Sequence, residues 1–210
     1  RASWAMWTST SHPPLAPFCG FARHRRSGRV IANFTGFEAD LLRSLASQLV
    51  ELLHSEAAVP EDRDPFEALM DFTGPATEPE DPVLARLFPT AYPDDEEAAG
   101  EFRRFTEGAL RDGKARAAAT IIDTLEEAGL PDELREDGLT IDVEMDADTA
   151  HAWMRSFTDI RLALATRLGV EDGDEDYWYA LPEDDPRAQA HDIYDWVGYL
   201  QETLVGALSR

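Results

Sequence analysis

The sequence predicts an α+β fold that is predominantly α-helical, a helical bundle with a small N-terminal β-hairpin or sheet. Apolar residues recur at steps of three and four through most of the chain after residue 35, and two short runs near the N-terminus flank a turn. Hydrophobic residues make up 43% of the 210 residues, enough to bury one sizeable core. We therefore expect one domain at residues 21–210, preceded by a loose leader at residues 1–20.

The N-terminal hairpin is predicted around a turn at residues 26–29. Residues 21–25 and 30–34 flank this turn, and the second run alternates in the way of a strand with one wet face. Residues 139–145 also alternate apolar side chains with Thr, Asp and Glu. They predict a strand that can pair with the hairpin in a small sheet.

The first helices are predicted from their caps. Thr35, with Glu38 three residues later, forms a capping box before a helix at residues 36–54. Asp64 followed by Pro65 predicts a second, short helix. Asp81 followed by proline predicts a third, which ends at a further proline, residue 89.

Residues 94–128 form a long, Ala-rich helical region. Gly108 and Gly113 are expected to divide it into two helices or to bend it. Its expected apolar anchors are Phe102, Phe105, Leu110, Ile121, Ile122 and Leu125.

Two more helices complete the prediction. One is capped near Asp146 or Asp148 and ends at Gly169, a left-handed C-cap, and the last spans about 189–208. The residues expected to share one core are Phe37, Leu41, Leu45, Phe105, Trp153, Phe157, Leu164, Trp196 and Leu200.

An acidic loop is predicted at residues 171–187, which hold eight acids in seventeen residues. A calcium-loop template is matched at positions 1, 3, 5 and 12 by Asp172, Asp174, Asp176 and Glu183. The template needs glycine at position 6, where this chain has Tyr177, so a solvated loop is favoured over a metal site. Its aromatic residues either pin the loop to the core or form a contact patch: Tyr177, Trp178 and Tyr179.

The charge of the chain is divided at Phe37. Residues 1–37 contain five arginines and no acid, whereas the rest holds all 42 acidic residues against 14 basic ones, a formal net charge of −28. Such a body repels phosphates, so we expect weak or no DNA binding by the isolated protein and a basic protein surface or a cation as partner. Four arginines of the hairpin have no acid near them in the sequence and are candidates for an interaction: Arg23, Arg25, Arg26 and Arg29.

Enzyme signatures are missing from the sequence. It has no phosphate-binding glycine loop, nucleophile elbow or His-Glu-x-x-His motif, and its five histidines are dispersed. We predict no enzyme activity and no catalytic, cofactor or metal site. The single cysteine excludes an intramolecular disulfide, and no apolar run is long enough to cross a membrane, so we expect a cytoplasmic protein.

Four ordered blocks of sequence point to a known family. They are ARLFPTAY at 85–92, EFRRFTE at 101–107, DIRLALATRLG at 159–169, and the stretch 194–204 with its YDW and LQETL segments. Together with their order along residues 21–208, these blocks resemble the actinobacterial AosR-type oxidative-stress transcriptional regulators, formerly a domain of unknown function.

The resemblance implies transcriptional control through a sigma factor or RNA polymerase, with redox sensing by cysteine. Cys19 is the only cysteine, so redox control would need a disulfide between two copies, another oxidation state, or a partner's thiol. An incidental Cys19 is the alternative. A second function also stays open, an acidic adaptor with no catalytic activity and no role in transcription.

Arginines inside these blocks are expected to form structural ion pairs. Arg103 can reach Glu107 at i,i+4 on one helix, and Asp195 and Glu202 are the expected partners of Arg161. Acidic residues outnumber basic residues threefold after Phe37. Local pairing is therefore favoured over a contact site for these arginines.

Overall fold

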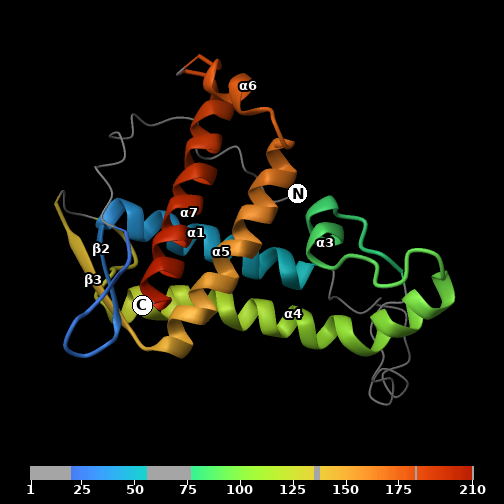
Figure 1. The fold of residues 1–210 in the computed structure, drawn as a ribbon, viewed down its shortest axis with the longest axis horizontal. Helices are drawn as coiled ribbons and strands as arrows, with labels where there is room; N and C mark the ends of the chain where they lie inside the picture. The colour runs from blue at the N-terminus through green and yellow to red at the C-terminus, as the bar shows by residue number, and fades with distance from the viewer. Residues whose placement is uncertain (1–19, 56–76, 135–137, 183, 210) are drawn as a thin grey trace.

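The computed structural model describes residues 20–55, 77–134, 138–182 and 184–209 (Figure 1). Its elements are β1 (Ala22–Arg23), β2 (Val30–Thr35), α1 (Gly36–Ser55), α3 (Pro82–Leu87), α4 (Glu96–Glu127), β3 (Thr140–Met145), α5 (Ala147–Leu168), α6 (Glu175–Tyr179) and α7 (Pro186–Leu208). This arrangement confirms the predicted class, α+β and predominantly helical. The expected leader and the short helix at Asp64 lie outside the described residues.

The three strands form an antiparallel sheet in the order β1-β2-β3, at one end of the helices (Figure 1). Val30 pairs with Met145, and Phe34 pairs with Ile141. These side chains are buried, whereas Asn33 and Asp142 on the opposite face form an exposed hydrogen bond of 2.6 Å. The predicted hairpin and the predicted third strand are both confirmed.

Helix boundaries follow from local capping bonds. The Thr35 N–H donates to Glu38 Oε2 at 2.8 Å, and the Glu38 N–H donates to Thr35 Oγ1 at 3.2 Å, so the capping box is present. Asp81 and Asp146 accept backbone N–H bonds at the starts of α3 and α5. Gly169 ends α5 with φ of 74°, a left-handed conformation that glycine adopts at little cost.

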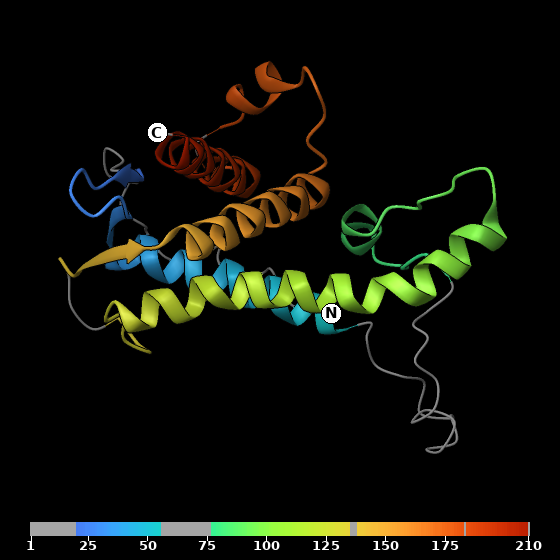
Figure 2. The same cartoon turned by 60° about the horizontal axis from the view of Figure 1, so that its bottom comes forward.

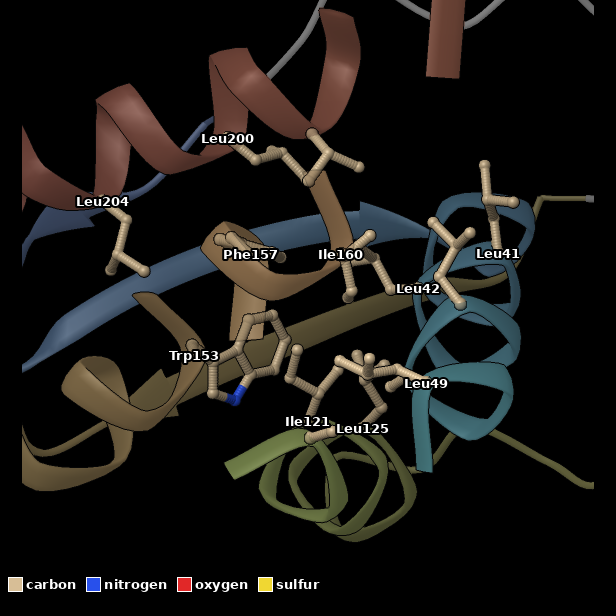
Figure 3. Close-up of a cluster of buried hydrophobic side chains, with 14 of the residues drawn as sticks. Leu41, Leu42, Leu49, Ile121, Leu125, Trp153, Phe157, Ile160, Leu200 and Leu204 are labelled. Carbon is tan, nitrogen blue, oxygen red and sulfur yellow. The ribbon is translucent and has the colours of Figure 1, made fainter. Parts of the chain in front are cut away.

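The core is centred on Trp153 of α5, which is fully buried. Its ring makes edge contacts with Phe21 and Phe157 at centroid distances of 5.7 and 5.8 Å and stacks on Phe34 at 6.2 Å. Figure 3 shows apolar side chains of α1, α4, α5 and α7 around this ring. The indole N–H donates to Thr124 Oγ1 at 3.3 Å, so the polar end of the ring is satisfied as well.

Helix α4 is continuous, whereas Gly108 and Gly113 were expected to divide or bend it. It runs without interruption for 32 residues, along α1 on one side and α5 on the other (Figure 2). A Cβ added at Gly108 or Gly113 would meet nothing within 4 Å, so both glycines lie on open surface. Each weakens the helix by roughly 1 kcal/mol relative to alanine, but neither breaks its hydrogen bonds.

The expected anchors in the first half of α4 are also wrong. Phe102, Phe105 and Leu110 are 44%, 67% and 50% exposed, whereas Ile121 and Leu125 in the second half are fully buried. The core set expected from the sequence is therefore corrected at Phe105. Its other members are buried, apart from Phe37, which is half-buried against the core.

Residues 171–187, between α5 and α7, were expected to form a loop, but the structure shows a short helix within them. Residues Glu175–Tyr179 form the short helix α6, which packs against α7. Trp178 of α6 is buried, which explains why a strongly acidic stretch still folds onto the body of the protein.

We predict that Trp196→Ala will lower the free energy of unfolding by about 3–5 kcal/mol, because truncating a buried aromatic side chain leaves a cavity. Trp196 is 3% exposed on α7. Val205→Ala on the exposed side of the same helix is the control and should change stability by less than about 0.5 kcal/mol. Urea unfolding followed by circular dichroism measures both, and equal midpoints for the two variants would show that α7 does not complete the core.

Candidate interaction site

The inner face of the first half of α4 carries charges instead of apolar side chains. Glu107 is 2% exposed and lies between two arginines one helical turn away on either side. Its Oε2 accepts from Arg103 Nη1 at 2.7 Å, and its Oε1 accepts from Arg111 Nε at 2.9 Å. The predicted ion pair of Arg103 with Glu107 is thus one half of a buried triad.

The two arginines also bind backbone carbonyls at the ends of neighbouring helices. Arg103 Nη1 donates to the Phe88 carbonyl at the end of α3 (3.2 Å), and Arg111 Nη1 donates to the Leu53 carbonyl in the last turn of α1 (2.9 Å). A cation suits this end of a helix, where carbonyls lack intrahelical partners. The triad therefore fixes α4 against both α1 and α3.

A second, partly buried pair extends this polar layer to α5. Lys114 Nζ donates to Asp159 Oδ1 at 2.6 Å, and Asp159 is 4% exposed. Burial raises the pKa of Asp159 above its usual value, although the Lys114 ammonium opposes the shift. The Phe88 ring lies under the cations, with Arg111 Cζ 4.8 Å and Lys114 Nζ 5.9 Å from its centroid.

The outer face of the same part of α4 is aromatic. Phe102 and Phe105 point away from the triad side of the helix, and Tyr92, 48% exposed, meets the Phe102 ring edge-on at 5.8 Å. Exposed apolar residues scattered singly are ordinary, but here two rings touch, and Phe105, three residues after Phe102, lies on the same face of the helix. We call Tyr92, Phe102 and Phe105 the aromatic patch.

The hairpin arginines are exposed, as an interaction role requires. Arg29, however, has an acidic neighbour from β3, because its Nε lies 3.1 Å from Glu144 Oε1 and its Nη2 donates to the Glu144 carbonyl. The hairpin arginines were expected to have no acidic neighbour, and Glu144 corrects this expectation for Arg29. Arg25 and Arg26 both lie in the turn, and Arg23 lies in β1.

The three aromatic residues of α6 have different environments. Trp178 stacks on the His191 ring with centroids 4.9 Å apart, and its indole N–H donates to Asp174 Oδ2 at 2.7 Å. Tyr177 and Tyr179 are 49% and 74% exposed. Trp178 is the buried residue that pins the segment to α7, and the Tyr179 ring also meets the His191 ring edge-on at 6.1 Å. A contact patch at Tyr177 and Tyr179 stays a prediction.

Arg161 does not pair with Asp195 or Glu202, which corrects that expectation. Its Nη1 donates to Gln201 Oε1 at 2.9 Å, and its guanidinium lies over the Tyr194 ring, 5.2 Å from the centroid. Each of these two partners directly precedes one of the suggested acids in the sequence, so each acid lies about 100° further around α7. Asp195 accepts instead from the Tyr179 hydroxyl at 3.5 Å, and Glu202 is exposed.

A groove of about 610 Å³ lies between α1 and α5. Its apolar wall includes Leu49 and Ile160, and an ion pair of Arg167 with Asp81 stands at its margin. Partial burial would raise the pKa of Asp81, but hydrogen bonds from Arg167 and from backbone N–H groups bring it below its usual value. The pair joins α5 to the cap of α3.

The described ranges contain no group of three or more His, Cys, Asp or Glu side chains placed to hold a metal ion. In the acidic segment, Asp174 already accepts from the Glu171 N–H as well as from Trp178. No helix in the described part of the chain is long and apolar enough to cross a membrane. Cys19 lies outside the described residues.

The aromatic patch is the site feature that the sequence analysis missed, although a signal for it was present. The buried stripe of α4, followed back from Leu125 in steps of three and four, passes through Ile121 and Ala118 and then meets Arg111, Glu107 and Arg103. A helix has one buried face. That stripe therefore predicts that Phe102 and Phe105 face outward.

Comparison with known proteins finds one matching family model and several relatives. The family model described as Domain of unknown function (DUF2017) matches residues 19–208. A relative in Mycobacterium bovis named "Oxidative stress regulator AosR" is 31% identical over 201 residues, which is 86% of this chain and 83% of the relative. The protein of the same name in Mycobacterium tuberculosis strain H37Rv gives the same values.

A Mycobacterium leprae relative that also bears the AosR name is 32% identical over 188 residues, 81% of this chain and 78% of its own length. No solved structure gives a significant match.

We predict that Glu107→Gln will lower the free energy of unfolding by about 3–5 kcal/mol, because it leaves two buried guanidinium groups without their carboxylate. Glu101→Gln on the exposed side of α4 is the control and should stay within about 0.5 kcal/mol of the wild type. Urea unfolding at neutral pH measures the difference. A Glu107→Gln protein as stable as the control would show that the triad does not hold α4 in place.

Proposed function

The chain belongs to the family described as Domain of unknown function (DUF2017), and from this premise we propose that it regulates the oxidative-stress response by acting on transcription through protein–protein contacts. The observation that carries the proposal is the identity of 31–32% with relatives that bear the AosR name, over more than four-fifths of this chain. Two of these relatives are named oxidative stress regulators without qualification.

Protein contacts are favoured over direct DNA binding by the charge of the chain. Residues after Phe37 carry a formal net charge of −28, and DNA affinity depends largely on neutralising phosphates. Arg25 and Arg26 could make a few phosphate contacts at most, and Arg29 already has Glu144 beside it. A sigma factor or RNA polymerase, which carry basic surfaces where they hold nucleic acid, is the kind of partner that fits such a body.

The regulator acts without catalysis in this proposal. The buried charged groups of α4 and α5 are engaged with one another and with backbone carbonyls, which is the pattern of a structural network. A second candidate function is an acidic adaptor with no role in transcription, and it is favoured by the same negative charge. The two functions differ in the partner that they require.

We predict that a tagged chain, expressed in its native cells, will co-purify with RNA polymerase or a sigma factor. The complex should weaken as salt is raised, because screening reduces attraction between opposite charges. In parallel, the isolated protein should give no sequence-specific gel shift with promoter DNA at about 0.15 M salt. Co-purification without any transcription protein would favour the adaptor, and a tight specific shift by the isolated protein would refute the protein-contact mode.

We predict that Cys19→Ser will abolish any peroxide-induced disulfide band on a non-reducing gel, because Cys19 is the only cysteine of the chain. Partner binding under reducing conditions should stay unchanged, with Ser209→Ala as a control at the exposed end of α7. Loss of binding by Cys19→Ser under reducing conditions would show that the thiol itself belongs to the contact surface.

A further inference from the structure

We propose that the outer face of the first half of α4, from Glu101 to Gly113 and together with Tyr92, is a docking surface for a basic amphipathic helix of a protein partner. The inference rests on the proposed function only in its protein-contact mode. It goes further by naming the surface and the chemistry of what covers it.

The first observation is that this part of α4 is inverted. Three charged residues, Arg103, Glu107 and Arg111, face the body of the protein, while Phe102 and Phe105 face outward. The hydrophobic effect alone would turn such a helix the other way, because burying a large apolar side chain is favourable and burying a charge is costly. The triad and its two carbonyl contacts hold the inverted orientation instead.

The second observation is that the outward residues form a seam. Phe102, Phe105, Ala109 and Gly113 follow one another at steps of three, four and four, the spacing of one helix face. Tyr92 extends the seam beyond the start of α4 through its ring contact with Phe102. A partner helix reads such a face through its own apolar residues at the same spacing.

Gly113 adds a third observation. A Cβ at this position would meet nothing within 4 Å, so no contact within the described part of the chain calls for glycine there. Glycine inside an exposed helix is unfavourable relative to alanine. A partner backbone that approaches closely at the end of the seam gives the missing reason, since glycine permits such an approach.

The charge around the seam selects the occupant. Five exposed acids precede Phe102, namely Asp94, Asp95, Glu96, Glu97 and Glu101. Arg104 is an exposed cation on the same turn as the patch. A helix with lysines or arginines beside its apolar stripe matches this border, whereas a second copy would place the same acids against themselves. DNA and anionic lipid are repelled for the same reason.

The face is also preorganised. The triad binds the ends of α1 and α3, so the segment that carries Phe102 and Phe105 is fixed from behind before any partner arrives. Figure 2 shows this half of α4 extending past the packed helices at the end where α3 lies. A rigid, projecting face loses little conformational freedom on binding.

The test uses the full chain and a fluorescein-labelled model helix in which leucines repeat at steps of three and four among lysines. Fluorescence anisotropy at about 0.15 M salt measures its affinity. The double variant carries Phe102→Ser and Phe105→Ser, which keep the net charge of the chain. Val205→Ser, at an exposed position of α7, is the control. The double variant should bind at least about tenfold more weakly, and the control should bind as the wild type does.

Unchanged binding by the double variant would overturn the proposal, because it would show attraction by charge alone. A model helix with glutamates in place of lysines should not bind, and equal binding of the two helices would overturn the choice of a basic partner. Gly113→Leu should raise the melting temperature but weaken binding. If it strengthens binding, the surface is a nonspecific apolar patch.

Sedimentation of the wild type and the double variant separates the remaining alternative. If the wild type sediments as a dimer and the double variant as a monomer, the face belongs to a contact with a second copy, and the proposal is refuted. Failure of the proposed function is distinguishable from failure of the docking surface. If polymerase co-purifies equally with the wild type and the double variant, the proposed function stands and the docking surface is refuted. If the wild type binds the lysine helix but co-purifies with no transcription protein, the docking surface stands and the proposed function is refuted.

Discussion

The carboxylate of Glu107, buried between two guanidinium groups, is the constraint on which this part of the fold depends. Each arginine that it holds is bound in turn to a carbonyl of a different helix, Leu53 in α1 and Phe88 after α3. One acid therefore orients two long side chains that join three helices. Without it, the guanidinium groups would repel each other in a site that water barely reaches.

This constraint divides α4 into two halves with different roles. In the second half, Ala118, Ile121 and Leu125 pack apolar surface against the core around Trp153, and burial of apolar area is sufficient to hold the helix. In the first half the same stripe is ionic. Since the inner positions are occupied by charged groups that satisfy one another, the aromatic residues of that half are left on the outside.

Local features of the fold could be predicted from the sequence, and contacts between distant elements could not. The capping box at Thr35, the cap at Asp81 and the glycine at residue 169 depend on neighbours within a few residues. The partners of Arg161 and Arg29 depend on how α7 and β3 lie against α5 and β2. The prediction that Phe105 is buried in the core was wrong for a related reason, since the apolar character of one residue does not say which face of its helix is buried.

The distribution of cations explains how a chain with a formal net charge of −23 can still have a selective surface. Basic residues after Phe37 are few, and several of them bind inside the fold or between its elements: Arg103, Arg111 and Lys114 in α4, and Arg161 and Arg167 in α5. Positive charge engaged in this way does little to offset the exposed carboxylates. In the docking mode that we propose, the exposed carboxylates would attract a basic partner from a distance, and the apolar seam of α4 would decide where it docks.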